Sequence, residues 1–237
     1  MINSLFSSLS GLNTASRKLQ ASANNLANVQ TPGFKSSRVN IVDNASGGAR
    51  VAGVTRSPSQ GPLVPTSNPL DVAVLGNGFL QVTLGGGGTG FTRLGAIKID
   101  GSGRLVTADG HPLIPEITIP GNAQNVSIGP DGSVSALVNG QTQTVGQLQL
   151  AGFQNPAGLN ALGNGLFTVS GSSGQPIFGS PGTNSLGTLQ SGSLELSNVD
   201  ITEEIVQQIL ASSQFRANAS AIRAADDMTG TLLDITA

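Results

Sequence analysis

The feature that most constrains the fold is a regular row of apolar residues at the N-terminus. Its members are separated alternately by three and four positions, as at the a and d positions of a coiled coil. They are Ile2, Leu5, Leu9, Leu12, Ser16, Leu19, Ala23 and Leu26, with Ser16 as the polar interruption. The row predicts a helix over residues 3–29. Such a row could also cover a globular core, but its 3.5-residue period favours packing against another helix.

Thr31-Pro32-Gly33 marks the end of this helix. A residue that precedes proline is disfavoured in the α region, and glycine accepts a positive φ. Phe34 follows at once, and we expect it to anchor the turn to the next part of the chain.

A second helix is predicted over residues 201–235. Asp200 is a candidate N-cap with Glu203 three positions later, and Glu203 and Glu204 lie in the first turn, where the helix dipole favours negative charge. A row spaced by four and three positions follows: Ile201, Ile205, Gln208, Ser212, Phe215, Ala219, Ile222, Asp226, Thr229 and Leu233. Only six of these ten are apolar, but Val206, Ile209 and Leu232 widen the stripe. This helix is therefore predicted to touch more than one neighbour.

The segment between the two predicted helices has the pattern of antiparallel β structure. Apolar runs of strand length, such as residues 79–84 and 134–138, alternate with turn signals. Asn139-Gly140, Asn164-Gly165 and four further Asn-Gly or Asp-Gly pairs suit the positive φ angles of tight hairpin turns. Residues 34–69 and 170–193 are rich in Gly, Pro or Ser and are predicted as extended connectors.

The predicted fold class is therefore α+β. Long N- and C-terminal helices pair as a coiled-coil-like bundle, and a central antiparallel β-rich module lies between them in the sequence. The predicted domains are an N-terminal polymerisation helix (1–33), an extended connector (34–69), a central β-rich module (70–196) and a C-terminal polymerisation helix (197–237). A lone helix pair in water is marginal, so we expect assembly with other copies to supply the missing contacts.

Composition excludes several classes of function. Charged residues are only 10% of the chain, against roughly 25% in an ordinary soluble domain. This suits a surface buried against copies of itself, because each buried charge would lose its hydration. The net charge of −2 and the lack of a basic stripe argue against a nucleic-acid partner. No apolar run reaches the ~18 residues of a membrane span, and the N-terminus does not resemble a cleaved signal peptide.

The sequence also offers little catalytic chemistry. It has no cysteine, and its single histidine, His111, precedes a proline in a turn region. With one histidine and no cysteine, the chain cannot supply the ligands of a His/Cys metal cluster or the histidine-assisted nucleophile of a hydrolase. The glycine run 85–88 lacks the Lys-Ser or Lys-Thr that follows in a phosphate-binding loop. We expect no enzymatic activity, no catalytic or metal residues and no cofactor.

Two segments resemble the signatures of the bacterial flagellar rod and hook family of axial proteins. Residues 23–35, Ala-Asn-Asn-Leu-Ala-Asn-Val-Gln-Thr-Pro-Gly-Phe-Lys, look like the N-terminal signature, and residues 197–206 are similar to the signature where the closing helix begins. Residues 68–82 and Gly90-Phe91-Thr92-Arg93 resemble the start of the central module. The signature residues singled out are Asn24, Asn25, Leu26, Ala27, Asn28, Thr31, Pro32, Gly33, Phe34, Ser197, Asn198 and Val199.

The resemblance implies a structural subunit of the flagellar basal-body rod that self-assembles into a helical axial tube and transmits torque. The central module is most similar to members from the distal rod, with the proximal rod and the hook as alternatives. The implied partners are copies of the same chain in a helical polymer and other rod and hook subunits, with the rings around the rod as further candidates. The implied location is the periplasmic basal body, after export through the flagellar type III apparatus.

The residues expected to carry assembly are the large apolar members of the two rows. They are Leu5, Leu9, Leu12, Leu19 and Leu26 on the first helix and Ile205, Ile209, Phe215 and Ile222 on the second. Outside the flagellar family, the same pattern would fit a β-domain binding module whose helices form a dimerising stalk. A discrete oligomer of fixed size would distinguish that alternative from a polymer.

Overall fold

The computed structural model describes residues 2–45 and 47–236. The chain divides into two compact units. Unit 1 contains the chain up to Val29, Ser36–Ser57 and the chain from Val199 onward, and unit 2 contains Gln30–Lys35 and Pro58–Asn198. The side chains of three residues named for the predicted rows, Ile2, Leu232 and Leu233, lie outside the described part of the structure.

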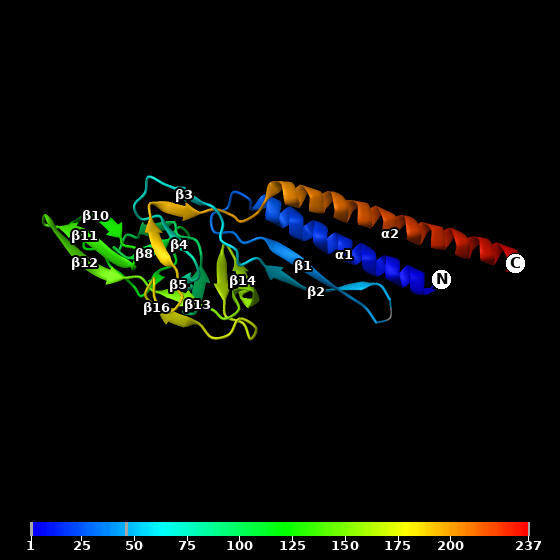
Figure 1. Ribbon diagram of the computed structural model, residues 1–237, viewed down its shortest axis with the longest axis horizontal. Helices are drawn as coiled ribbons and strands as arrows, with labels where there is room; N and C mark the ends of the chain where they lie inside the picture. The colour runs from blue at the N-terminus through cyan, green and yellow to red at the C-terminus, as the bar shows by residue number, and fades with distance from the viewer. Residues whose placement is uncertain (1, 46, 237) are drawn as a thin grey trace. The chain divides into compact units, whose positions relative to one another are not determined.

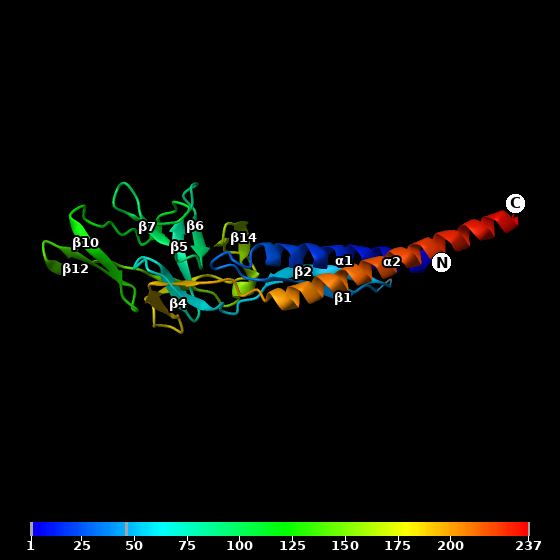
Figure 2. The ribbon, with the colours of Figure 1, turned by 90° about the horizontal axis from the view of Figure 1, so that it is seen from above.

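Two long helices form most of unit 1. α1 spans Ile2–Ala27 and α2 spans Ile201–Thr236, close to the ranges expected from the sequence. They lie side by side and antiparallel, with the N- and C-termini at the same end (Figure 1, Figure 2). Asp200 caps α2, because its Oδ1 accepts the N–H groups of Thr202 and Glu203 at 2.7 and 3.1 Å. The predicted pairing of the terminal helices is confirmed.

A β-hairpin also belongs to unit 1 and contacts α1. Its strands are β1 (Ser37–Asp43) and β2 (Ala49–Arg56). Ala49 N–H donates to Ser10 Oγ at 3.1 Å, and a Cβ at Gly48 would overlap that hydroxyl, so the hairpin lies very close to the helix. The sequence indicated only an extended connector over residues 34–69. Half-buried and exposed residues alternate along both strands, but few of the half-buried ones are large and apolar enough to reveal a strand.

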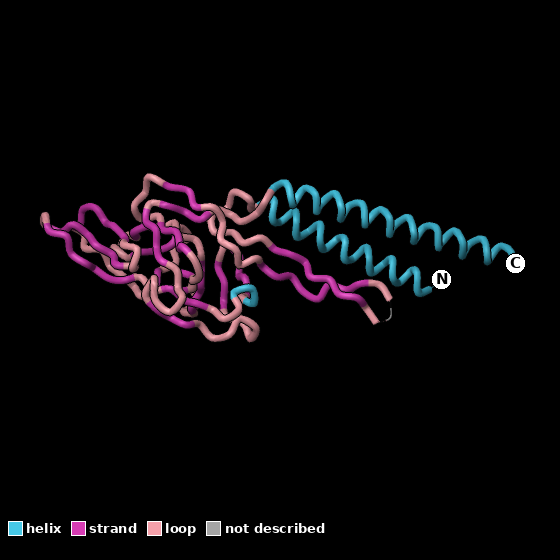
Figure 3. The backbone as a smooth tube through the Cα atoms, viewed as in Figure 1, coloured by secondary structure: helices cyan, strands magenta, loops and turns pink. Residues whose placement is uncertain are grey.

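Unit 2 is built from antiparallel strands, drawn in magenta in Figure 3. They are β3 (Leu63–Pro65), β4 (Val72–Leu75), β5 (Phe79–Thr83), β6 (Thr89–Thr92), β7 (Ile97–Ile99), β8 (Leu105–Thr107), β9 (Leu113–Ile114), β10 (Ala123–Ile128), β11 (Ser133–Val138), β12 (Gln141–Gln147), β13 (Leu150–Gly152), β14 (Asn160–Gly163), β15 (Leu166–Thr168), β16 (Ile177–Gly179), β17 (Thr188–Ser191) and β18 (Ser193–Glu195), with a 3-10 turn η1 (Pro156–Gly158). The predicted central antiparallel module is confirmed.

The strands of unit 2 form several small sheets around one large one. The large sheet has the order β14-β15-β6-β5-β13-β16, and β9 also pairs with β5. A three-stranded sheet has the order β10-β11-β12. Three two-stranded pairs, β4 with β17, β3 with β18 and β7 with β8, complete the unit. Strands β3 and β18 bring the beginning and the end of the unit together.

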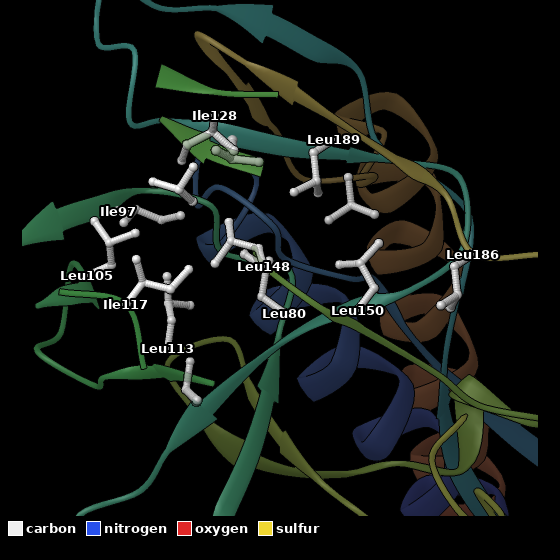
Figure 4. Packing of buried hydrophobic residues seen from close by; sticks show 14 of the residues in the cluster. Leu80, Ile97, Leu105, Leu113, Ile117, Ile128, Leu148, Leu150, Leu186 and Leu189 are labelled. Atoms are coloured by element: carbon white, nitrogen blue, oxygen red, sulfur yellow. The ribbon is translucent and has the colours of Figure 1, made fainter. Parts of the chain in front are cut away.

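The largest part of the core of unit 2 is a cluster of aliphatic side chains. Figure 4 shows Leu80 and Leu148 close together near its middle, with Leu150 on one side of them and Ile97 and Leu105 on the other. A second, aromatic cluster contains Phe79, Phe91, Phe153 and Phe167, whose rings meet edge to face at centroid distances such as 4.9 Å for Phe91 and Phe153. Each fully buried side chain of this size contributes roughly 1.5–3 kcal/mol, so unit 2 has a substantial core of its own.

Gly95 permits a very close approach of two backbone segments in this core. Val72 N–H donates to Gly95 O at 2.9 Å, and a Cβ at Gly95 would overlap the carbonyl oxygen of Val72. Val72 is completely buried at the start of β4 and cannot move aside. We expect Gly95→Ala to lower the unfolding free energy of unit 2 by about 3 kcal/mol, measured by urea unfolding followed by circular dichroism.

The control for this substitution is Gly101→Ala, because nothing lies within 4 Å of a Cβ at Gly101. If both variants unfold at the same urea concentration, the close approach at Gly95 does not constrain the fold.

Candidate assembly site

The contact between α1 and α2 is made by small and polar residues. Ala15 and Ala211 are buried, and a Cβ at Gly11 would lie only 2.6 Å from Asn218 Oδ1. Lys18 Nζ donates to Gln214 Oε1 at 3.5 Å across the pair. The helices therefore approach closely at small residues, while most of the large apolar side chains of α2 remain exposed.

The predicted leucine row of α1 is only partly covered in unit 1. Leu9 is 57% exposed and Leu19 is also exposed, whereas Leu5, Leu12 and Leu26 are half-buried. Phe6, beside the row, is exposed as well. The face of α1 that is buried carries Thr14, Ala15, Ser22 and Asn25 instead.

The apolar stripe of α2 is also accessible. Ile209 is 60% exposed, Ile205 and Phe215 are exposed, and Ile222 is half-buried. Ile201, Val206, Leu210 and Met228 add further exposed apolar surface. Large contiguous apolar patches are rare on monomeric soluble proteins and mark surfaces that other molecules cover.

Asn25 of the N-terminal signature joins three elements of unit 1. Its Nδ2 donates to Ser37 O at 2.8 Å and to Glu204 Oε1 at 2.7 Å, and its Oδ1 accepts Ser37 N–H at 2.8 Å. Ser22 Oγ, one turn earlier, donates to Glu204 O at 2.9 Å. A fully buried amide thus fixes α1, β1 and the first turn of α2 to one another, which gives this signature position a physical role.

We expect Asn25→Ala to lower the unfolding free energy of unit 1 by roughly 2 kcal/mol, because it leaves the Ser37 N–H and C=O groups without their partner. Hydrogen exchange of the α2 amides, measured by mass spectrometry, checks this. Asn24→Ala is the matched control, since Asn24 is exposed on the same helix. Equal exchange in the two variants would show that the hydrogen bonds of Asn25 add nothing.

An open pocket of about 330 Å³ in unit 1 is lined in part by Ser37 and Glu204, the two hydrogen-bond partners of Asn25. Both signs of charge are present in its lining, from Lys18, Arg38, Glu203 and Glu204, and Arg38 pairs with Glu203 at 3.1 Å on the exposed surface.

Within residues 2–45 and 47–236, no group of three or more His, Asp or Glu side chains is placed to hold a metal ion. No described helix is long and apolar enough to cross a membrane.

The two signatures meet in unit 2. Gly33 N–H donates to Glu195 O at 2.7 Å, and Asn198 N–H donates to Phe34 O at 3.4 Å. Asn198 Nδ2 also donates to Ser59 O at 2.9 Å. Gly33 has a φ of +66° and is buried, which explains why glycine occupies the position after proline. Phe34 is half-buried at this junction.

A buried ion cluster lies beneath this junction. Glu195 is fully buried and binds Lys35 Nζ at 2.6 Å and Arg93 Nη1 at 3.3 Å through its two carboxylate oxygens. Gly61 N–H donates to Glu195 Oε1 at 2.9 Å, and Lys35 also donates to Ser59 O at 2.7 Å. The Arg93 guanidinium lies over the Phe79 ring, 5.3 Å from its centroid. The cluster holds together four segments that are far apart in the sequence.

Burial lowers the pKa of the Lys35 ammonium group and of the Arg93 guanidinium below their usual values. The hydrogen bond and charge of Glu195 oppose both shifts. Glu195 is therefore the group that makes burial of the two cations tolerable. Lys35 and Arg93 belong to segments that resemble the family, but the sequence did not assign a role to them or to Glu195.

The remaining signature residues are placed as follows. Asn24 and Ala27 are exposed, and Leu26, Asn28, Thr31, Pro32 and Val199 are half-buried. Ser197 is buried. The signatures thus combine residues that stabilise the fold with residues that remain at the surface.

Three family models match the chain. The model for flagella basal body rod proteins matches residues 5–35, the model for the flagellar hook protein FlgE/F/G D1 domain matches residues 73–136, and the model for the flagellar basal body rod FlgEFG protein C-terminal region matches residues 190–235. The first and last of these include both signatures.

Similarity to known relatives extends along nearly the whole chain. FlgG of Buchnera aphidicola subsp. Schizaphis graminum is 40% identical over 253 aligned positions, covering 96% of this chain and 97% of the relative. FlgG of Bacillus subtilis is 35% identical over 263 positions, covering 99% of each. The hook protein FlgE of Escherichia coli is 38% identical, but the match covers 49% of this chain and 29% of FlgE. The chain therefore belongs to the FlgG family of flagellar basal-body rod proteins.

Proposed function

We propose that this chain is a structural, non-enzymatic subunit of the distal rod of the bacterial flagellum, and that it polymerises through the apolar stripes of α1 and α2. The observation that carries the proposal is the exposure of both stripes, with Leu9 and Ile209 more than half exposed, in a chain that matches FlgG over 96% of its length. The helices pair through small residues, which leaves the large ones for neighbouring copies.

The geometry supports an open helical assembly. An open array needs two different faces on each subunit, and the stripes of α1 and α2 are different in sequence and lie on two helices. Burial of each large apolar side chain contributes roughly 1.5–3 kcal/mol, so a few such contacts per copy stabilise a polymer. Because the chain has few charged residues, burial of its surface in a polymer costs little hydration free energy of charged groups.

The family membership places the protein in the flagellar basal body, in the periplasmic rod. Other rod and hook subunits are its proposed neighbours along the axis, and the rings that surround the rod are proposed contacts of its outer surface. Transmission of torque follows from this arrangement, because a rod built from rigid units coupled through apolar stripes resists twisting.

Sedimentation velocity of the full-length protein over a series of concentrations tests the proposal. We expect species that keep growing as the concentration rises, together with filaments in electron micrographs. A single oligomer of fixed size at every concentration would contradict the proposal and would favour a binding module with a dimerising stalk.

A further inference from the structure

The surface charges of unit 2 are confined to one segment. The charged residues of this unit outside residues 98–131 are Lys35, Asp71, Arg93 and Glu195, and all four are buried. Residues 132–194 contain no Asp, Glu, Lys, Arg or His at all. The surface formed by the second half of the unit is therefore uncharged.

The two outer strands of the large sheet lie in this uncharged half. β14 forms one edge and β16 forms the other, and no other described strand pairs with the outer side of either. Leu162 on β14 is 56% exposed, and Ile177 and Phe178 on β16 are 58% and 49% exposed. Sheet edges are commonly protected by charged side chains, and neither of these edges carries one.

We propose that these two edges form a second contact between copies of this chain, in which β14 of one copy meets β16 of the next. The inference rests on the proposed polymerisation. The two opposite edges of the sheet are different surfaces. Identical copies can therefore join the β14 edge of one to the β16 edge of the next, repeatedly and in one direction, without closing into a ring. A partner of another kind would need only one uncharged edge.

Charge also favours a sister copy at these edges. Residues 98–131 carry four acidic and two basic residues, so like-charged segments of two copies would repel each other. The uncharged edges are the parts of unit 2 where two copies can approach without that repulsion. The contact excludes the charged segment and buries Leu162 against Ile177 and Phe178.

The contact is made by side chains more than by backbone pairing. Both edge strands are short, and the register of β14 shifts between Ala161 and Gly163, which leaves Leu162 without an opposite residue on β15. Such a bulge limits continuous pairing with another strand. Three apolar side chains also fall far short of the roughly 800 Å² per partner of a stable interface. The edges therefore act only together with the helical contacts and leave the monomer soluble.

Cysteine cross-linking in the full-length chain tests this contact, because the natural sequence has no cysteine. The variant carries Leu162→Cys and Ile177→Cys and is treated with a short bismaleimide. Within one copy the two positions are separated by five strand spacings, or about 24 Å along the sheet, and a link within one copy would leave a monomer and not a ladder. We expect a ladder of covalent dimers, trimers and longer products in the polymer, and only monomer below the polymerisation threshold.

The controls define the outcome. A variant with Val64→Cys and Ile99→Cys, two exposed positions of unit 2 away from both edges, should give no ladder. Polymers of the test variant that form normally but do not cross-link would overturn the edge contact and leave the proposed function intact. Variants that carry only Leu162→Cys or only Ile177→Cys should not cross-link. A cross-link in either would show that two β14 edges or two β16 edges meet, which would also overturn the proposed contact. Failure of the unsubstituted chain to polymerise would contradict the proposed function itself.

A second variant measures the effect on assembly. Ile177→Lys should raise the concentration needed for polymerisation by about tenfold, whereas Ile99→Lys should leave it unchanged. Equal thresholds for the two variants would contradict the contact.

Discussion

Replacing Glu195 by glutamine is expected to lower the unfolding free energy of unit 2 by about 3–5 kcal/mol, which is the usual cost of removing one partner from a buried ion pair. Lys35 and Arg93 would then remain buried near each other without a negative charge. Because the chain has no tryptophan or tyrosine, we suggest urea unfolding followed by circular dichroism, with hydrogen exchange to assign the loss to β3, β4 and β18.

Glu116→Gln is the matched control, since Glu116 is an exposed acid of the same unit and lies 3.7 Å from Arg104 in a surface ion pair. We expect it to change stability by well under about 1 kcal/mol. A Lys35→Met substitution combined with Glu195→Gln should recover part of the lost stability by removing one uncompensated cation. If Glu195→Gln is as stable as Glu116→Gln, the cluster does not hold the junction together.

The second large effect is expected at the apolar stripes. Leu9→Asp or Ile209→Asp should abolish polymerisation while leaving the monomer folded, because both side chains are mostly exposed in unit 1. A charge at either position would be buried without a partner in the assembled state, which costs far more than the lost apolar contact. Sedimentation velocity measures assembly, and circular dichroism checks that the helices persist.

Asn13→Asp is the control for the added charge, because Asn13 is an exposed polar residue of α1 outside the leucine row. We expect this variant to polymerise like the natural chain. Normal polymers from Leu9→Asp, or loss of polymers from Asn13→Asp, would show that the stripe was assigned to the wrong residues.

Much of the fold was predictable because its signals are local. The strict spacing of the leucines predicted α1, and Asp200 predicted the start of α2. Asn139-Gly140 and Asn164-Gly165 have positive φ at both residues and join β11 to β12 and β14 to β15, as hairpin turns of this type require. Each of these depends on neighbouring residues alone.

The sequence did not reveal which face of α1 meets α2. Sequence patterns identify a packed face by its large apolar residues, but this contact uses Gly11, Ala15 and Ser22, whose small size permits close approach. The hairpin β1–β2 was missed because few of its half-buried residues are large and apolar, and β16, β17 and β18 were missed because they have only 3, 4 and 3 residues.

The ion cluster could not be predicted because it depends on distant residues. Lys35 and Glu195 are 160 positions apart, and only the fold brings them together. The sequence offered one signal, which is that charged residues are rare, at 10% of the chain. Lys35 directly after the Pro-Gly-Phe turn, and Glu195 after a run of 63 uncharged residues, are therefore unusual. Such isolated charges are worth testing as buried partners.

Electron cryomicroscopy of filaments grown from the whole chain would show which surfaces join the copies. We expect the stripes containing Leu9 and Ile209 to lie against neighbouring copies, while the pairing of α1 with α2 through Gly11 and Ala15 is kept within each subunit. A filament in which both stripes face solvent, and the copies meet through other surfaces, would contradict this expectation.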